Sequence, residues 1–417
     1  MLAPIRLTAR YLAQIEIWPV GLAIAASIVW PGLLPAAVIT AAFFWPVRWI
    51  AYQRFSLRSP GDLPIALILL LLPVTLYTTG LPEKTWPQVY RVLTGIALYY
   101  AMFNWGNSRP RLRWLVNGVV LAGLLLACMA PFSIQWTIGP LQFTPGVFYQ
   151  RLGPLISDAI HPNVMAGNLV LLLPISAACL LFSWREMSWP ERVLFAISAA
   201  FILGMLGLTR SRGAWIAVIL VIAVLFVLRW RWGWVGLVLA AGLVILAGSR
   251  IGVSPILELV ASDSSIGGLE DRIDIWSRSI FMIRDFPFTG IGMGTFTQVA
   301  DTLYPFSLAL PGTIYHAHNL FLQIAVDLGV LGLIAWMAIL FTILTLSWQL
   351  YRSKTWPMQS SAAGIGAGLF CSQLALIVHG LTDAVTWGMV RPAPLVWALW
   401  GLAVAAWIVY HSSPGTN

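Results

Sequence analysis

The segment Tyr315–Asn319 holds residues that could move a proton. It reads Tyr-His-Ala-His-Asn and stands immediately before a long apolar stretch. Imidazole titrates near neutral pH, so His318, or His316 two residues earlier, could accept a proton from an attacking hydroxyl group. A histidine here could also simply cap the following helix, or lie as an amphipathic ring at a membrane interface. Both interpretations stay open at this point.

A second group of residues could bind an anion. Arg210 and Arg212 lie between two apolar segments, in Leu-Thr-Arg-Ser-Arg-Gly-Ala-Trp. A planar guanidinium suits bidentate contact with phosphate oxygens better than an ammonium does. The alternative is that these side chains only extend from the membrane into water. Arg272 could likewise bind an anion, or pair with Asp271 and Asp274 at the surface with little gain in stability.

Other polar residues stand at the ends of apolar segments or inside them. His161 opens one such segment in His-Pro-Asn, while His379 and Asp383 close another, and each could contact substrate or cap a helix. Asp327 lies within an apolar segment, where an acid is costly and is by default a functional candidate. The glycines of residues 290–294 have the spacing of a nucleotide-binding loop. No predicted strand precedes them and no lysine follows, which favours a flexible turn.

Composition predicts the elements that position these residues. The chain has 417 residues, of which 59% are hydrophobic and 9% charged, whereas soluble domains are about a quarter charged. We therefore expect an all-α integral membrane protein, since lipid leaves open backbone groups unsatisfied. About twelve transmembrane helices are expected from apolar stretches of sufficient length. The predicted spans are 15–30, 32–47, 63–79, 88–105, 114–131, 164–183, 192–208, 213–228, 232–248, 319–348, 359–381 and 393–410.

Charge predicts the topology. Lys and Arg follow every even-numbered span, which favours cytoplasmic positions for both termini. The first two spans, separated by Pro31-Gly32, could instead form one re-entrant hairpin. Segments 132–163 and 249–318 then form long outer loops, and apolar residues within Leu269–Asp285 recur at the spacing of an amphipathic surface helix. Arginines on the outer side oppose the usual bias and point to an anionic substrate. Their scattering argues against nucleic acid.

These residues together resemble a known family. His318-Asn319, followed nine residues later by Gly329-Val330, resembles the histidine motif of the O-antigen ligases and polymerases. Ser211-Arg212-Gly213 is similar to an arginine turn of that family, and Arg272 resembles a second functional arginine in its large outer loop. The resemblance covers roughly residues 160–385.

The resemblance implies a GT-C-like membrane glycosyltransferase, inverting and free of metal and cofactors. It would transfer a glycan from undecaprenyl diphosphate to a lipid-anchored sugar, such as lipid A-core, at the periplasmic face of the bacterial inner membrane. It implies an N-terminal bundle (1–160), a catalytic core (161–385) that includes the periplasmic loop 249–318, and a final helix with a tail (386–417). The implied catalytic residues are His318 and His316, and the implied diphosphate ligands are Arg210, Arg212 and Arg272. Further candidates are His161, Asn319, Asp327 and Asp383.

Two alternatives remain. A polymerase of the same superfamily would join lipid-linked repeat units, and no motif separates it from a ligase. A transporter would also contain about twelve helices, although transporters usually place charged groups near the midplane of the membrane. Here the charged groups lie mostly at the predicted outer rim, and Asp327 alone favours transport.

Overall fold

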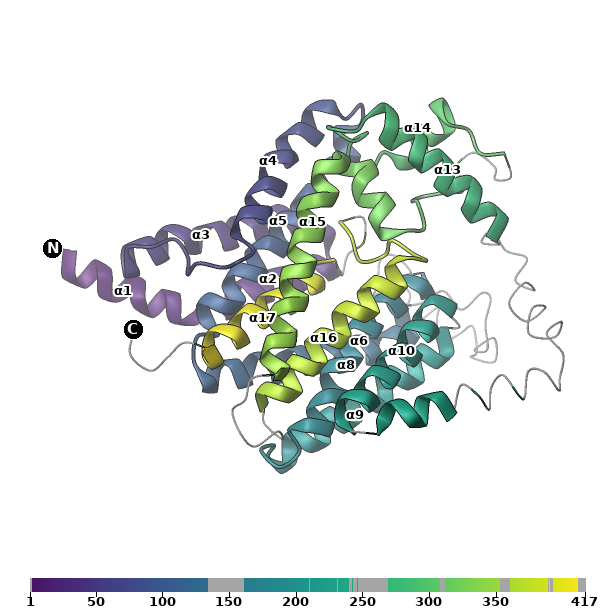
Figure 1. The fold of residues 1–417 in the computed structure, drawn as a ribbon. Helices are drawn as coiled ribbons and strands as arrows, with labels where there is room; N and C mark the ends of the chain where they lie inside the picture. The colour runs from purple at the N-terminus through teal and green to yellow at the C-terminus, as the bar shows by residue number, and fades with distance from the viewer. Residues whose placement is uncertain are drawn as a thin grey trace.

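The regular structure in the described part of the chain is all helical. A computed structural model describes residues 2–133, 161–209, 211–230, 232–239, 242, 246, 269–307, 312–352, 361–388, 390 and 393–411. No strand occurs among them. The helices that carry the argument are α1 Leu2–Ile15, α2 Ile17–Val29, α3 Leu34–Tyr52, α4 Asp62–Thr78, α5 Pro82–Trp105, α6 Arg109–Ser133, α8 Pro162–Phe182, α9 Trp189–Thr209, α10 Arg212–Arg229, α13 Leu269–Asp285, α14 Phe296–Leu303, α15 Leu320–Arg352, α16 Ser361–Gly380 and α17 Pro394–His411 (Figure 1).

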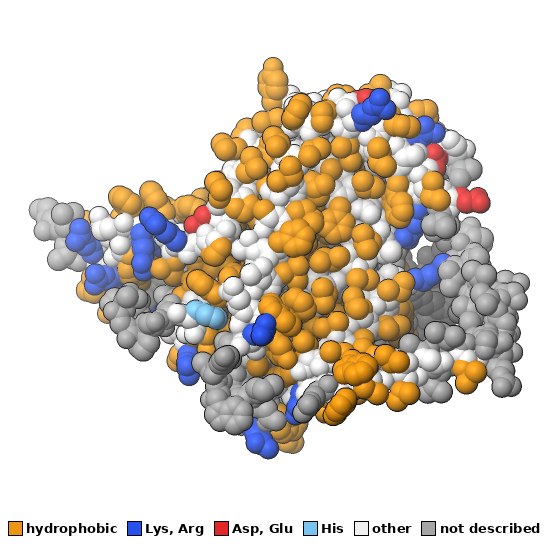
Figure 2. Space-filling view, in the orientation of Figure 1, with side chains coloured by type: hydrophobic (Ala, Val, Ile, Leu, Met, Phe, Trp, Pro, Cys, Tyr) orange, Lys and Arg blue, Asp and Glu red, His pale blue; other side chains and the backbone are white. Residues whose placement is uncertain are grey.

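Many of these helices suit a membrane. Within the described ranges, 8 helices are long and apolar enough to cross one, and α1 with α2, bent by 48°, could add a ninth. Hydrophobic side chains cover the middle of the face in Figure 2, as lipid contact requires. The all-helical class is therefore confirmed for the described residues, and the apolar helices are consistent with a membrane protein. Helices coincide with the predicted spans apart from 232–248, which extends beyond the described residues, and the number twelve stays a prediction.

The helix of the second predicted span, 32–47, continues beyond the predicted end to Tyr52. Arg48, which we expected in a cytoplasmic loop, lies inside α3, and its Nη1 donates to Glu16 Oε1 at 2.6 Å. Both side chains are buried. A charge buried between helices requires such a partner, because desolvation would otherwise be too costly. This pair joins α3 to the bend between α1 and α2.

α15 is broken at Gly329. This residue has φ 72° and ψ −178°, so two helical parts meet there. A Cβ at this position would lie 2.6 Å from the Pro287 carbonyl oxygen, and the neighbouring Val330 N–H donates to that same oxygen at 2.7 Å. The loop that precedes α14 also donates to the break, from Ile291 N–H to the Val326 carbonyl at 2.9 Å. Only glycine combines this backbone conformation with so close an approach.

The helix predicted over Leu269–Asp285 is present as α13. Figure 1 shows it with α14 beside one end of α15, and it packs against α15. Its inner face buries Ile275, Ser279 and Met282, whereas Ile273 and Ile280 are exposed. The apolar residues thus serve two faces, one toward the protein and one outward. The outer segment's remaining part, 249–268, lies outside the described residues.

Candidate functional site

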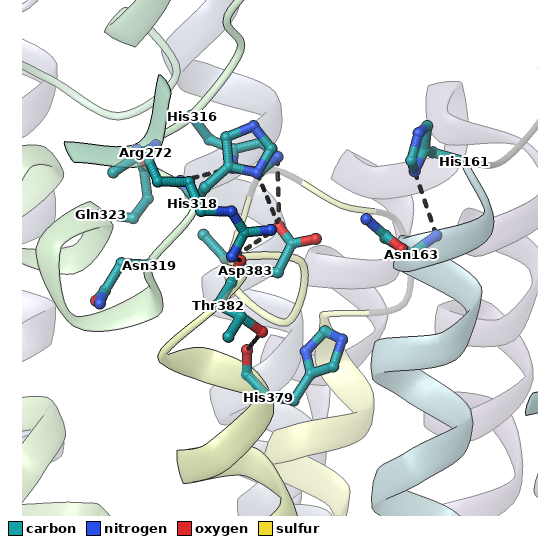
Figure 3. A network of polar contacts seen from close by, with 12 residues as sticks. His161, Asn163, Arg272, His316, His318, Asn319, Gln323, His379, Thr382 and Asp383 are labelled. Atoms are coloured by element: carbon teal, nitrogen blue, oxygen red, sulfur yellow. Dashed lines mark hydrogen bonds and ion pairs between the residues drawn. The ribbon is translucent and has the colours of Figure 1, made fainter. Parts of the chain in front are cut away.

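Two histidines that precede α15 lie beside a carboxylate that follows α16. His316 Nε2 lies 3.6 Å from Asp383 Oδ1, and His318 Nδ1 lies 3.7 Å from the same oxygen. The ring centroids of the histidines are 4.1 Å apart. Figure 3 shows these side chains and Arg272 converging on Asp383. Residues distant in sequence therefore form one cluster, as the catalytic prediction requires.

The backbone gives the two histidines different hydrogen-bonding states. His318 has a φ of 47°, a left-handed conformation that is strained for this residue type. Its backbone N–H donates to His316 Nδ1 at 3.1 Å, and the N–H of Ala317 donates to Gln323 Oε1 at 2.8 Å. A ring nitrogen that accepts a hydrogen bond carries no proton, so the hydrogen of neutral His316 is on Nε2, facing Asp383. Nδ1 of His316 is thereby occupied, while its Nε2 faces Asp383 at 3.6 Å.

His318 retains a nitrogen for chemistry. Its Nδ1 faces Asp383, so a hydrogen there leaves Nε2 as a lone-pair acceptor. The side chain is 26% exposed, against 5% for that of Asp383. A carboxylate that orients one nitrogen while the other accepts a proton is the arrangement of a general base. His318 therefore fits the base better than His316, which helps to hold the loop.

Asn319 caps α15. Its Oδ1 accepts from the backbone N–H groups of Phe321 and Leu322 at 3.0 and 3.1 Å, and its Nδ2 donates to the Leu381 carbonyl at 3.3 Å. The cap satisfies the open first turn of the helix and ties it to the turn that carries Asp383. The asparagine of the His-Asn motif thus has a structural role beside the histidine.

One arginine of the predicted anion site reaches the same turn. Arg272 Nη1 donates to the Thr382 carbonyl at 2.9 Å. Burial lowers the pKa of Arg272; Asp383 raises it, and the charge of Arg212 lowers it again, so all three groups act on one another. Asp274 instead forms its ion pair with Arg278, at 3.3 Å.

Arg212 begins α10 against this turn. A Cβ on the following Gly213 would lie 2.2 Å from Thr382 Oγ1, so only glycine permits the contact. The Ser-Arg-Gly element therefore sets the N-terminus of α10, with its positive dipole end, beside Thr382, the residue before Asp383. Arg210, the other candidate, lies outside the described residues.

Burial and charge fix the protonation of the cluster. Burial, together with the charge of His316, lowers the pKa of His318 from 6.5 to about 3, although Asp383 acts in the opposite direction. Burial also lowers the pKa of His316. Burial would raise the pKa of Asp383, but His316, His318 and His379 outweigh it and hold that pKa below its usual value. At neutral pH the histidines are uncharged and the carboxylate is ionised, so His318 has an unprotonated ring nitrogen that can accept a proton.

Asp327 has both carboxylate oxygens in hydrogen bonds to other side chains. It is fully buried. Its Oδ1 accepts from Gln323 Nε2 at 3.0 Å, and its Oδ2 accepts from Trp387 Nε1 at 2.8 Å. Gln323 also accepts a hydrogen bond from the backbone N–H of Ala317, between the two histidines. Trp387 lies in the same segment as Asp383, after α16. Asp327 thus connects the two segments that carry the cluster.

A cavity of about 830 Å³ opens beside the cluster. His161, predicted as a possible substrate contact, lines it and also caps α8, because its Nδ1 accepts from the Asn163 backbone N–H at 3.2 Å. His318 and Asp383 form another part of its wall. The site is therefore open to a ligand on this side.

The donor atoms could hold a metal ion. Those of His316, His318 and Asp383 lie within 4.8 Å of one another, and two imidazoles with a carboxylate occur in catalytic zinc sites. Arg272 and Arg212 place positive charge close by, which opposes the binding of a dication. Metal independence stays a prediction.

Sequence reasoning missed three residues of the site. Gln323, Thr382 and Trp387 make side-chain or carbonyl contacts that place the cluster. Gln323 and Asp327 stand four residues apart on a helix, so their pairing was visible as a spacing. Nothing local indicated Thr382 or Trp387, because their partners lie on other helices. The glycine loop 290–294 is a tight turn against Asp327 and α5, with positive φ at Gly290, Gly292 and Gly294.

Comparison with known proteins agrees with this geometry. Residues 195–337 match the family model described as O-antigen ligase. This region of the chain is thus similar to the O-antigen ligase family. An O-antigen ligase of Pseudomonas aeruginosa is 24% identical over 79% of this chain and 86% of its own length. The family match contains Arg212, Arg272 and both histidines of the cluster, whereas Asp383 lies beyond its end.

Proposed function

We propose that this protein is an inverting, metal-independent O-antigen ligase. Its donor is a glycan on undecaprenyl diphosphate, and its acceptor is a sugar hydroxyl of a lipid-anchored core at the periplasmic face of the inner membrane. The observation that carries the proposal is the cluster in which Asp383 faces His318 Nδ1 beside Arg272. A base next to an anion-binding group is what transfer from a diphosphate needs.

The reaction is a single displacement. The acceptor hydroxyl attacks the anomeric carbon, and its proton passes to His318 Nε2. The bond between that carbon and the diphosphate oxygen breaks as the new glycosidic bond forms, and the diphosphate leaves with the electron pair. Asp383 stabilises the imidazolium that results, because its carboxylate lies 3.7 Å from Nδ1.

The arginines stabilise the leaving group. Arg212 lies at the N-terminus of α10, and Arg272 is held by the Thr382 carbonyl. Two guanidinium groups and a helix dipole offer the positive charge that a metal ion supplies in many transferases. Arg272 donates a hydrogen bond to the carbonyl of Thr382, the residue before Asp383. This bond connects the anion site to the carboxylate that faces the base.

The test is transfer by purified protein in lipid vesicles. Undecaprenyl diphosphate glycan and lipid A-core are supplied together, and then the donor alone. We expect a glycosylated core of inverted anomeric configuration by NMR, unaffected by chelator. Lengthened donor without a core product would identify a polymerase instead. Movement of a solute across the vesicle with no transfer of either kind would identify a transporter.

A further inference from the structure

The cavity beside the cluster has a second, polar wall. Lys84 and Gln88 of α5 and Thr297, Gln298 and Asp301 of α14 line it, together with His318. Apart from His318, none of these residues entered the argument for the reaction. Arg212 and Arg272 are absent from the described lining. The cavity therefore adjoins the cluster, and neither described arginine of the anion site lines it.

This wall is held rigidly. Thr85 Oγ1, on α5, donates to the Met293 carbonyl at 2.8 Å, in the loop that leads into α14. Gly294 has φ +82°, and a Cβ there would lie 2.5 Å from Gln88 Nε2. The absence of a side chain at this position is what lets Gln88 pack against the loop. Both glutamines therefore belong to one preformed surface.

The wall has unused hydrogen-bonding capacity. Gln88 Oε1 and Gln298 Oε1 are buried and have no hydrogen-bond partner among the described residues. Buried acceptors without a hydrogen-bond partner are uncommon in native proteins, so we expect a bound ligand to donate to these oxygens. A half-turn of each amide exchanges oxygen and nitrogen, so each side chain can accept from a ligand or donate to one.

The chemistry of the wall indicates the ligand class. Besides the two amides it offers a threonine hydroxyl, one lysine and one aspartate, so its formal charges cancel. Asp301 accepts from the Gly312 backbone N–H at 2.8 Å, and its carboxylate would repel a diphosphate. Amides and hydroxyls without excess charge suit a polyhydroxylated, largely neutral molecule. That description fits a sugar.

Stereochemistry decides which sugar. Inversion at the anomeric carbon requires the nucleophile and the leaving group on opposite sides of it. Arg272 contacts the Thr382 carbonyl, and Figure 3 shows it and the cavity residue His161 to either side of Asp383 in that view. We propose that this cavity binds the acceptor sugar and that Gln88 and Gln298 recognise its hydroxyl groups. The proposal rests on the transferase function argued above.

The experiment separates acceptor from donor. Gln298→Leu and Gln88→Leu remove hydrogen bonding at similar volume, and KM is measured for each substrate in turn. Each change should raise the KM for the acceptor by about 2- to 12-fold, the effect of one hydrogen bond, with the KM for the donor unchanged. Gln298→Glu keeps an acceptor oxygen and should restore most of the affinity. The matched controls are Thr302→Ala on α14 and Glu83→Gln on α5, both exposed and outside the cavity lining.

A second measurement does not depend on transfer. Binding of the delipidated core oligosaccharide to wild-type protein, without donor, is compared with binding to each leucine variant. Weaker binding supports the acceptor site even where a variant loses activity. Unchanged binding and unchanged acceptor KM in both variants would overturn it, as would a rise confined to the donor KM. Wild-type protein that transfers nothing refutes the proposed function instead, so the two failures are distinct.

Discussion

At the scale of single residues, Asp383 faces two histidines that differ in what they can still do. His316 Nδ1 is occupied by the His318 backbone N–H, and its Nε2 faces Asp383. His318 keeps Nε2 for a proton. We therefore expect His318→Ala to lower transfer by about 10² to 10⁴, the range for loss of a general base, and His316→Ala to lower it less.

The strained backbone at His318 requires a control for this prediction. Asparagine tolerates a positive φ better than alanine does, so His318→Asn should keep the loop and still lose the base. Transfer rates and donor binding are measured for all three variants. Full activity in His318→Asn, with donor bound, would remove this histidine from the mechanism.

The dependence on pH follows from burial. Unperturbed histidine has a pKa near 6.5, and about a tenth of it is neutral at pH 5.5. In the folded protein the pKa of His318 is lowered to about 3, so kcat/KM should stay nearly level between pH 7.5 and pH 5.5. The unfolded chain binds this proton below pH 6.5 and the folded chain does not, so the free energy of unfolding falls as the pH drops from 6.5 toward 3. A tenfold loss of kcat/KM by pH 5.5, at unchanged folding, would contradict a buried neutral base.

The arginines give a third prediction at this scale. Arg212→Ala and Arg272→Ala should each lower kcat/KM by about 10- to 150-fold, because a charge-assisted hydrogen bond is worth about 1.5 to 3 kcal/mol. Lysine at either position should rescue activity only partly, since the planar fork is lost. Arg284→Ala, an exposed arginine on the same helix as Arg272, is the matched control. If Arg272→Ala and Arg284→Ala lowered kcat/KM equally, the loss would reflect the change in net charge and not a specific contact of Arg272 with the diphosphate.

At the scale of elements, the break in α15 organises the site. Gly329 lets the Pro287 carbonyl reach Val330, and Asp327 stands two residues before it with bonds to Gln323 and Trp387. The Gly-Val part of the family motif therefore maintains a backbone crossing, while its His-Asn part supplies a base and a cap. The spacing between these two parts of the motif corresponds to the short helical part of α15 that runs from the cluster to the break at Gly329.

Gly329→Ala tests this element. Alanine is strained at φ 72° and its Cβ would meet the Pro287 carbonyl at 2.6 Å, so we expect a loss of about 1 to 3 kcal/mol in stability. Thermal unfolding in detergent measures it, and transfer should fall in parallel. Gly118→Ala is the control, because nothing lies within 4 Å of its added Cβ on α6. Equal melting temperatures for the two variants would argue against a role for the break.

At the scale of the whole molecule, the cluster lies at one end of the helical bundle. The charge distribution predicts that this end faces the periplasm and that the turn between α8 and α9 faces the cytoplasm. An impermeant thiol reagent should label a cysteine placed at Thr302 and spare one placed at Arg185, both exposed positions. A variant without Cys128, Cys179 and Cys371 provides the background. If the reagent labelled only the Arg185→Cys variant, the orientation would be the opposite of the predicted one.

The sequence by itself determined the class of protein and most of its helices. Apolar length and the cost of open backbone groups in lipid make helical spans unavoidable, so these could be read from composition. Amphipathic spacing likewise predicted α13 with its bounds. His318, Arg272 and Asp383 were named because titratable groups are costly near a membrane and stand out against apolar neighbours.

Only the tertiary structure decided how these residues divide the work. The contact of Arg272 with the Thr382 carbonyl and the pairing of Asp327 with Trp387 join segments that are distant in the sequence, and the local bond from the His318 backbone to His316 Nδ1 depends on the backbone conformation of the loop. The sequence pattern carries no distances between helices, so Asp327 stood as an isolated functional candidate and Gln323 went unnoticed. Packing sets which lone pairs remain open, and that choice makes His318 the candidate base.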